Sequence, residues 1–372
     1  MEPEPDGGAA TPAQQVLDMV CRAMERAGEP HIAPKGWFVP ALSRLYRSVG
    51  MRLGERASAD HDEMVATGEV VVGVLPQNID KNRYSNICPA DAQRVVLRRR
   101  SEPDDETTDY INASHVKAPS VTAIASQGPT HPSWHGPDTT GDFWAAVWEQ
   151  AVEVIVGLAK VQRGFSGSAR YWPEAVGSTV PARGWPELTV TLLAEDAGPH
   201  FTTRRLQLVH TPTGGGADAR TSREVTQLHY DRWPNYGVPD NAVDMAMLLR
   251  CVEEIEARRL ASPAGASPAP PLWVHCSGGV GRTGVFLSAL SAFRSVFPTA
   301  AAGSAPQVSP CKDPEALAES VAATVASLRK QRHPWMVEGE AQFVFAHAML
   351  MHELHAKAVA MGAVHDKDGG SL

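Results

Sequence analysis

One stretch of the sequence, residues 273–284, restricts the possible folds more than any other. Residues 273–275 are apolar or aromatic and predict the end of a buried strand, and the apolar run 285–290 predicts a helix. Between them lies a turn in which three of the five residues separating Cys276 from Arg282 are glycine. A strand that enters a helix through such a turn is typical of α/β proteins that bind anions at the helix N-terminus.

The residue types in this turn predict a phosphate site with a reactive thiol at its base. Glycine lets backbone N–H groups converge on one point, and the helix N-terminus adds positive potential there. Arg282 can hold two phosphate oxygens with its planar guanidinium, and these surroundings favour the thiolate form of Cys276. A thiolate beneath a bound phosphate is a nucleophile directed at phosphorus. We expect Thr283 to donate a hydroxyl toward the sulfur, and the phosphate to be held by Ser277, Gly278, Gly279, Val280 and Gly281.

Composition narrows the possible partners. The net charge of −8 argues against nucleic acid as the main partner. The five cysteines show no paired spacing, which indicates reduced thiols in an intracellular compartment and no metal site. No apolar run approaches the roughly 20 residues that span a bilayer, and no secretory segment is evident. We therefore expect a cytoplasmic monomer without a membrane contact or a cofactor.

Helical and strand patterns alternate along the chain. Strands are expected near residues 94–97, 109–114, 123–129, 152–158, 188–193, 202–210 and 225–230, and helices near 141–150, 241–259, 313–331 and 338–359. This interleaved order favours one α/β domain. The expected organisation is a disordered N-terminus (1–13), helices packed on the domain (14–53), a catalytic domain (54–360) and a flexible C-terminus (361–372).

At residues 275–284 the chain resembles the signature loop of the protein tyrosine phosphatase family. Further stretches look like landmarks of its tyrosine-specific branch, in the family order: residues 81–84, 109–114, 127–129, 141–144, 171–173, 229–230 and 233–234. The resemblance implies a single large protein tyrosine phosphatase-like domain with a central twisted mixed sheet flanked by helices. It also implies that phosphotyrosine in proteins or peptides is dephosphorylated through a phosphocysteine intermediate.

The resemblance assigns roles to residues outside the loop. The aromatic side chain after Asn-Arg, here Tyr84, walls a cleft in the family that is too deep for phosphoserine to reach the nucleophile. Asn86 stands where an Asp usually holds the substrate backbone, and Gln342 corresponds to a Gln that positions the hydrolytic water.

One departure from the family concerns the general acid. The family's mobile loop reads Trp-Pro-Asp, whereas this chain has Asn235 in place of the Asp. An amide has no proton to donate near neutral pH, and loss of a positioned acid costs roughly 10²–10⁴ in rate. The flanking Asp231 and Asp240 are alternative acids, although both lie several residues from the required place.

A second departure surrounds the phosphate site. Gln162 stands where a Glu usually pairs with the signature Arg, Gly167 where a Lys is usual, and Glu338 where a Gln is usual. Three interpretations of Glu338 stay open: it pairs with Arg282, it acts as a base in hydrolysis, or it repels a dianion.

The sequence therefore supports three hypotheses about activity. The first is a phosphotyrosine phosphatase slowed by Asn235. The second is a phosphotyrosine-binding pseudophosphatase with little turnover, and the third is a substrate-trapping form in which the Asn was introduced.

Overall fold

The computed structural model of the protein describes residues 55–98, 109–132, 136–162, 167–214, 219–234, 237–239, 241–261, 269–297 and 314–360. The expected N-terminal segments (1–53), the C-terminus (361–372), Asn235 and Asp240 lie outside the described residues.

The centre of the described structure is a mixed sheet. Its nine strands in the described part of the chain are β1 (Arg94–Val96), β2 (Tyr110–Ala118), β3 (Val121–Ser126), β4 (Val154–Gly157), β5 (Thr179–Ala182), β6 (Trp185–Ala197), β7 (Thr202–His210), β8 (Thr221–His229) and β9 (Leu272–His275). They are ordered β1-β2-β3-β9-β4-β8-β7-β6-β5. The β3–β9, β9–β4 and β4–β8 pairs are parallel, and the outer pairs are antiparallel. The expected mixed sheet is confirmed.

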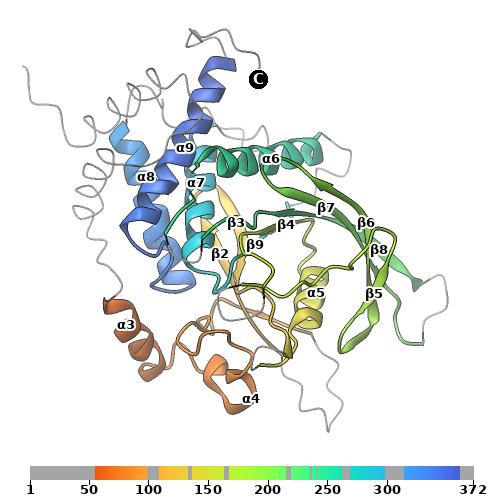
Figure 1. Cartoon of the computed structure of the whole chain (residues 1–372). Coiled ribbons are helices and arrows are strands. Elements are labelled where there is room, and N and C mark those ends of the chain that lie inside the picture. Colours follow the sequence, from red (N-terminus) through yellow and green to blue (C-terminus); the bar gives the residue numbers. More distant parts are fainter. Residues whose placement is uncertain are drawn as a thin grey trace, which may run out of the picture.

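Helices cover the sheet unequally (Figure 1). The helical segments are α3 (Glu55–Ala66), the 3₁₀ turn η1 (Val72–Val74), α4 (Pro76–Ile79), α5 (Thr140–Glu149), α6 (Val243–Leu260), α7 (Gly281–Val296), α8 (Pro314–Gln331) and α9 (Glu340–Ala360). The core that includes α6, α7, α8 and α9 packs on one face of the sheet, and the core that includes α5 packs on the other. None of the helices in these described ranges has the length and apolar character needed to cross a bilayer.

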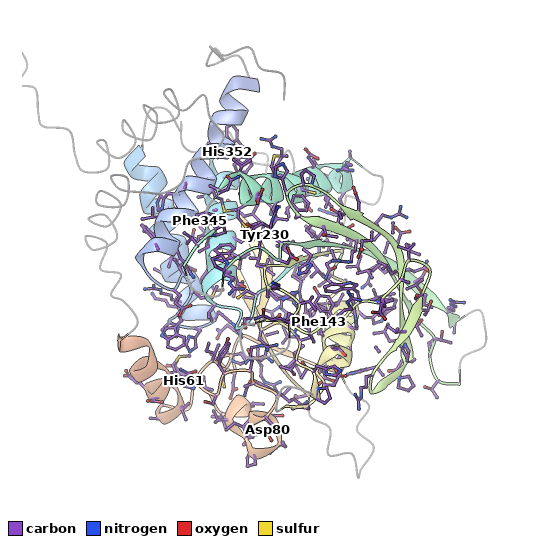
Figure 2. The ribbon with its side chains drawn as sticks, in the orientation of Figure 1. His61, Asp80, Phe143, Tyr230, Phe345 and His352 are labelled. Atoms are coloured by element: carbon purple, nitrogen blue, oxygen red, sulfur yellow. The ribbon has the colours of Figure 1, made fainter. Side chains whose placement is uncertain are left out.

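Strand β9 separates the two cores. All four of its residues are buried, as expected for a central parallel strand covered on both faces. Because strand side chains alternate, Val274 joins the core of α6 to α9, and Trp273 joins the core of α5. The Trp273 ring meets Phe143 edge to face at a centroid distance of 5.1 Å, and Figure 2 shows Phe143 in the middle of the molecule. The strand that leads to Cys276 is therefore fixed on both sides.

One strand was not predicted from the sequence, and the lengths of several others were predicted incorrectly. β5 was not expected, because its residues are largely exposed and include Pro181, and so lack the pattern of a buried strand. The strand expected over 123–129 ends at Ser126, because Gln127 and Gly128 turn away to bond with Asn112 and Ser277. β6 and β8 extend beyond the expected ranges as a long antiparallel ribbon with β7.

Candidate active site

The turn between β9 and α7 places the thiol of Cys276 at the base of a loop. β9 ends at His275, and α7 begins at Gly281. The Cys276 sulfur accepts a hydrogen bond from the backbone N–H of Gly279 over 3.2 Å, and the residue is 4% exposed. The sulfur therefore has an amide donor directed at it, and a helix begins five residues after Cys276 in the chain.

Arg332 holds this loop through the carbonyl oxygens of its backbone, a role that no pattern in the sequence indicated. Its guanidinium is buried and donates to the carbonyl oxygens of Gly278 and Gly279 over 3.1 and 3.3 Å, and also to Asn112. In a planar trans peptide the N–H points opposite to the C=O. The N–H groups of Gly279 and Val280 therefore point away from Arg332, the first of them to the sulfur. Burial lowers the pKa of Arg332 to about 10, which leaves it charged at neutral pH.

Gly279 is a position that only glycine fits. Its φ is +73°, in the left-handed region, and a Cβ atom there would lie 2.2 Å from the carbonyl carbon and oxygen of Ser126. Backbone in β3 cannot move aside as a flexible side chain can. The loop is thus packed directly on the end of β3.

We expect Gly279→Ala to lower the free energy of unfolding by about 3 kcal/mol or more, since backbone strain and a backbone clash add. Gly177→Ala is the matched control, because Gly177 has a φ of +85° and nothing within 4 Å of its Cβ position. The control should lose only about 1–2 kcal/mol. Urea unfolding measures both, and equal losses would contradict the close packing of the loop on β3.

Arg282 lies at the start of α7, beside the loop. Its side chain is buried, and Nη1 donates to the main-chain oxygen of Leu158 over 3.2 Å. Leu158 follows β4, and its own N–H is bonded to the oxygen of His275. The ends of two adjacent parallel strands therefore hold both the cysteine loop and the guanidinium that serves it.

The predicted hydrogen bond from Thr283 to the Cys276 sulfur is not formed in this structure. Its hydroxyl is buried and has no hydrogen-bond partner among the described residues, the Cys276 sulfur included. The sulfur instead accepts from the Gly279 amide, and the Thr283 side chain is enclosed in the packing of α7.

Tyr84 borders the loop at Ser277 and Gly278. Its hydroxyl lies 3.1 Å from the Ser277 hydroxyl, and its ring comes within 3.2 Å of where a Cβ atom of Gly278 would lie. Glycine at position 278 thus lets the aromatic ring approach the loop backbone. Asn86, two residues on, is partly exposed, and its main-chain oxygen accepts from the His333 ring over 2.9 Å.

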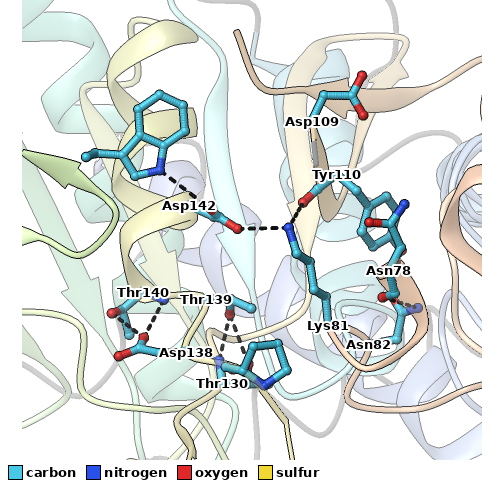
Figure 3. A network of polar contacts seen from close by, with 12 residues as sticks. Asn78, Lys81, Asn82, Asp109, Tyr110, Thr130, Asp138, Thr139, Thr140 and Asp142 are labelled. Atoms are coloured by element: carbon cyan, nitrogen blue, oxygen red, sulfur yellow. Dashed lines mark hydrogen bonds and ion pairs between the residues drawn. The ribbon is translucent and has the colours of Figure 1, made fainter. Parts of the chain in front are cut away.

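Polar contacts anchor the segment that carries Tyr84 (Figure 3). The Lys81 ammonium forms an ion pair of 3.3 Å with Asp142 of α5 and also donates to the main-chain oxygen of Tyr110. Asp142 in turn accepts from the Trp185 indole, and the Tyr110 hydroxyl donates to Asn82 over 2.6 Å. The segment is therefore fixed to both α5 and β2 before the chain reaches Tyr84.

Glu338 and Gln342 approach the loop from the other side, near Gly281. A Cβ atom on Gly281 would lie 2.9 Å from Oε1 of Gln342 and 3.2 Å from Cβ of Glu338. The Glu338 N–H donates to Gln342 Oε1 over 2.8 Å, and Val337 before it has a φ of +60°, which is rare for a β-branched residue. Arg329 holds this strained turn through the main-chain oxygens of Met336 and Val337.

The charge of Arg282 acts on the Glu338 carboxyl, although the two side chains form no ion pair. Partial desolvation raises the pKa of Glu338, and the positive charge of Arg282 opposes that rise. Among the ion pairs of the described residues, none joins Glu338 to Arg282. The structure therefore does not support the interpretation in which Glu338 pairs directly with Arg282. The same residues contain no group of three or more His, Cys, Asp or Glu side chains placed to hold a metal ion.

The structure thus gathers most of the expected site residues in one place. Cys276, the loop and Arg282 lie at the junction of β9 and α7, with Tyr84 on one side and Glu338 and Gln342 on the other. Asn86 contacts His333 through its main-chain oxygen, and Asn235 is outside the described residues.

Comparison with known proteins gives a consistent result. The family model described as Protein-tyrosine phosphatase matches residues 78–352. The receptor-type tyrosine-protein phosphatase V of Rattus norvegicus is 33% identical over 282 residues, which is 75% of this chain and 14% of that protein. The tyrosine-protein phosphatase non-receptor type 21 of Rattus norvegicus is 30% identical over 291 residues, which is 77% of this chain and 22% of that protein. The tyrosine-protein phosphatase non-receptor type 4 of Mus musculus is 36% identical over 221 residues, which is 58% of this chain and 20% of that protein. The chain therefore matches less than a quarter of the length of each of these relatives.

Proposed function

Because the chain belongs to the protein-tyrosine phosphatase family, we propose that it hydrolyses phosphotyrosine in proteins or peptides through a phosphocysteine intermediate. The observation that supports this most directly is the position of the Cys276 sulfur. It lies beneath a glycine-rich loop and accepts the Gly279 N–H, and the loop leads into the N-terminus of α7 and the buried Arg282.

In the first step, the Cys276 thiolate attacks phosphorus, the S–P bond forms, and the bond to the tyrosine oxygen breaks. The loop amides and Arg282 stabilise the charge on the phosphoryl oxygens, which is greatest in the transition state. Tyr84, placed against Ser277 and Gly278, lines the approach of the phenyl ring.

In the second step, water attacks phosphorus and the Cys276 thiolate leaves. Gln342 is suited to orient this water, because its amide lies beside Gly281 and is held there by the Glu338 N–H. Phosphate is then released from the loop.

Asn235 favours a slow reaction on phosphotyrosine, and a phosphotyrosine-binding module is the second candidate. A tyrosine leaving group has a pKa near 10 and needs protonation, which an amide does not provide. An aryl phosphate with an acidic phenol leaves without it.

Turnover of these two substrate types tests the proposal. We expect measurable hydrolysis of the activated aryl phosphate and poor hydrolysis of a phosphotyrosine peptide. Binding of the peptide without hydrolysis of either substrate would favour the binding module instead.

Glu338→Gln tests the remaining interpretations of that residue. Glu338 lies within reach of the Arg282 charge but forms no ion pair with it, so we expect its carboxylate to repel a bound dianion. The variant should bind inorganic phosphate about tenfold more tightly at neutral pH. The gain should disappear as the pH falls through the raised pKa of Glu338, because the wild-type carboxyl is then also neutral.

Glu174→Gln is the charge control for this measurement, since the Glu174 side chain is 92% exposed. Calorimetric titration with phosphate across the pH range distinguishes the interpretations. Unchanged or weaker binding by Glu338→Gln would instead support a helpful role as a base.

A further inference from the structure

A chain of buried hydrogen bonds leads from the outer strands of the sheet to His275, the residue before Cys276. Arg204 Nη1 donates to Gln227 Oε1 over 3.1 Å, Gln227 Nε2 donates to the Tyr171 hydroxyl over 2.6 Å, and that hydroxyl lies 2.7 Å from His275 Nε2. The four residues are at most 8% exposed. We refer to Arg204, Gln227, Tyr171 and His275 as the relay.

The relay is built on fixed elements. Arg204 of β7 and Gln227 of β8 are directly opposite each other in the antiparallel register. The Arg204 guanidinium lies 4.2 Å from the centre of the Trp172 ring and is ion-paired to Glu195 of β6. These contacts leave the guanidinium little freedom to move away from Gln227.

The chemistry of the donors gives the relay a direction. A guanidinium can only donate, so Gln227 must present its carbonyl oxygen to Arg204. The Gln227 NH₂ group then faces Tyr171 and donates to its oxygen. The single hydroxyl hydrogen of Tyr171 is left for His275, which therefore accepts at Nε2.

This direction fixes the tautomer of His275. Burial lowers the pKa of His275 to about 3, so the ring is neutral at working pH and carries one proton. With Nε2 as acceptor the proton is on Nδ1, which lies 3.3 Å from the main-chain oxygen of Cys276. The Nδ1–H group thus donates to that oxygen and polarises the peptide unit whose N–H belongs to Ser277, the first residue of the loop after Cys276.

We propose that Gln227, oriented by Arg204, is a positioning residue that sets the tautomer of His275 and thereby favours the thiolate form of Cys276. The inference rests on the proposed function only in taking Cys276 as the nucleophile. In the opposite tautomer an Nδ1 lone pair would face the Cys276 oxygen, and the two would repel each other.

Gln227→Glu tests the direction of the relay, because Glu has the same shape but only acceptor atoms. One carboxylate oxygen accepts from Arg204 and the other from the Tyr171 hydroxyl, whose oxygen then accepts from His275. We expect the ¹⁵N NMR shifts of labelled His275 to change from the Nδ1–H to the Nε2–H form. The pH profile of Cys276 alkylation by iodoacetamide should shift upward, with about tenfold slower modification below its midpoint.

Two further variants separate the tautomer from charge and from folding. Gln227→Met adds no charge and removes the donor to Tyr171, so we expect a mixture of His275 tautomers and an intermediate alkylation profile. Gln150→Glu adds the same charge at a partly buried position after α5 and should leave both readouts unchanged. Burial raises the pKa of Cys88 to about 11 and the pKa of Cys251 above its ordinary value, so we expect both thiols to react slowly with iodoacetamide. Peptide mapping identifies which thiol is modified.

The proposal is overturned if His275 keeps the Nδ1–H form in both Gln227 variants, or if their alkylation profiles coincide with that of the wild type. Neither readout requires turnover. A protein that shows both shifts but hydrolyses no phosphate ester would refute the proposed phosphatase activity and leave the relay supported.

Discussion

Cys276→Ser is expected to lower turnover of any aryl phosphate by at least about 10⁴-fold, because the hydroxyl of serine is a far weaker nucleophile than a thiolate. Binding of a phosphotyrosine peptide should change little, since Arg282 and the Gly279 amide are untouched. Steady-state kinetics and peptide titration measure the two effects separately.

Cys251→Ser is the control for this change. Cys251 is a partly exposed free thiol on α6, and burial and Glu254 raise its pKa, so we expect it to take no part in the reaction. The control should retain wild-type turnover. Appreciable turnover by Cys276→Ser itself would mean that a group other than this sulfur attacks phosphorus.

Asn235→Asp should raise turnover of a phosphotyrosine peptide by roughly 10²–10⁴, because a carboxylic acid can protonate the tyrosine oxygen as it leaves. Turnover of an activated aryl phosphate should change far less, since that leaving group needs no proton. The ratio of the two rates is therefore the sensitive measurement. The gain should decline at high pH, where the new carboxyl is ionised and no longer an acid.

Asn241→Asp provides the same chemical change nearby. The Asn241 side chain accepts from the Val243 N–H at the start of α6, a role that Asp also fills, so this variant should behave as the wild type. If Asn235→Asp leaves both substrates unhydrolysed, the phosphotyrosine-binding module is the better description of the protein.

The sequence predicted those parts of the fold and site that depend on local pattern. A strand, a glycine-rich turn and a helix in succession specified the cradle around Cys276, because neighbouring residues alone make the turn and the helix N-terminus. The same is true of most strands and helices, whose apolar periodicity is written in consecutive residues. β5 lacks that periodicity because it is an exposed edge strand, and it was missed.

Contacts between distant residues were decided by the tertiary structure. Arg332 donates a hydrogen bond to the oxygen of Gly279, 53 residues away in the sequence, and Gln227 donates one to Tyr171, 56 residues away. Neither pair is marked by a pattern in neighbouring residues of the sequence. For Thr283, a local pattern led to a contact that the structure does not contain. Its place beside Arg282 in the sequence suggested a hydrogen bond to the Cys276 sulfur, but in the packed helix α7 its hydroxyl does not form that bond. Sequence by itself thus determined the loop around Cys276 and the fold class, because backbone turns and helix dipoles are local. Only the folded sheet determined which buried side chains orient that loop, because hydrogen bonds there depend on register and burial between strands far apart in the chain.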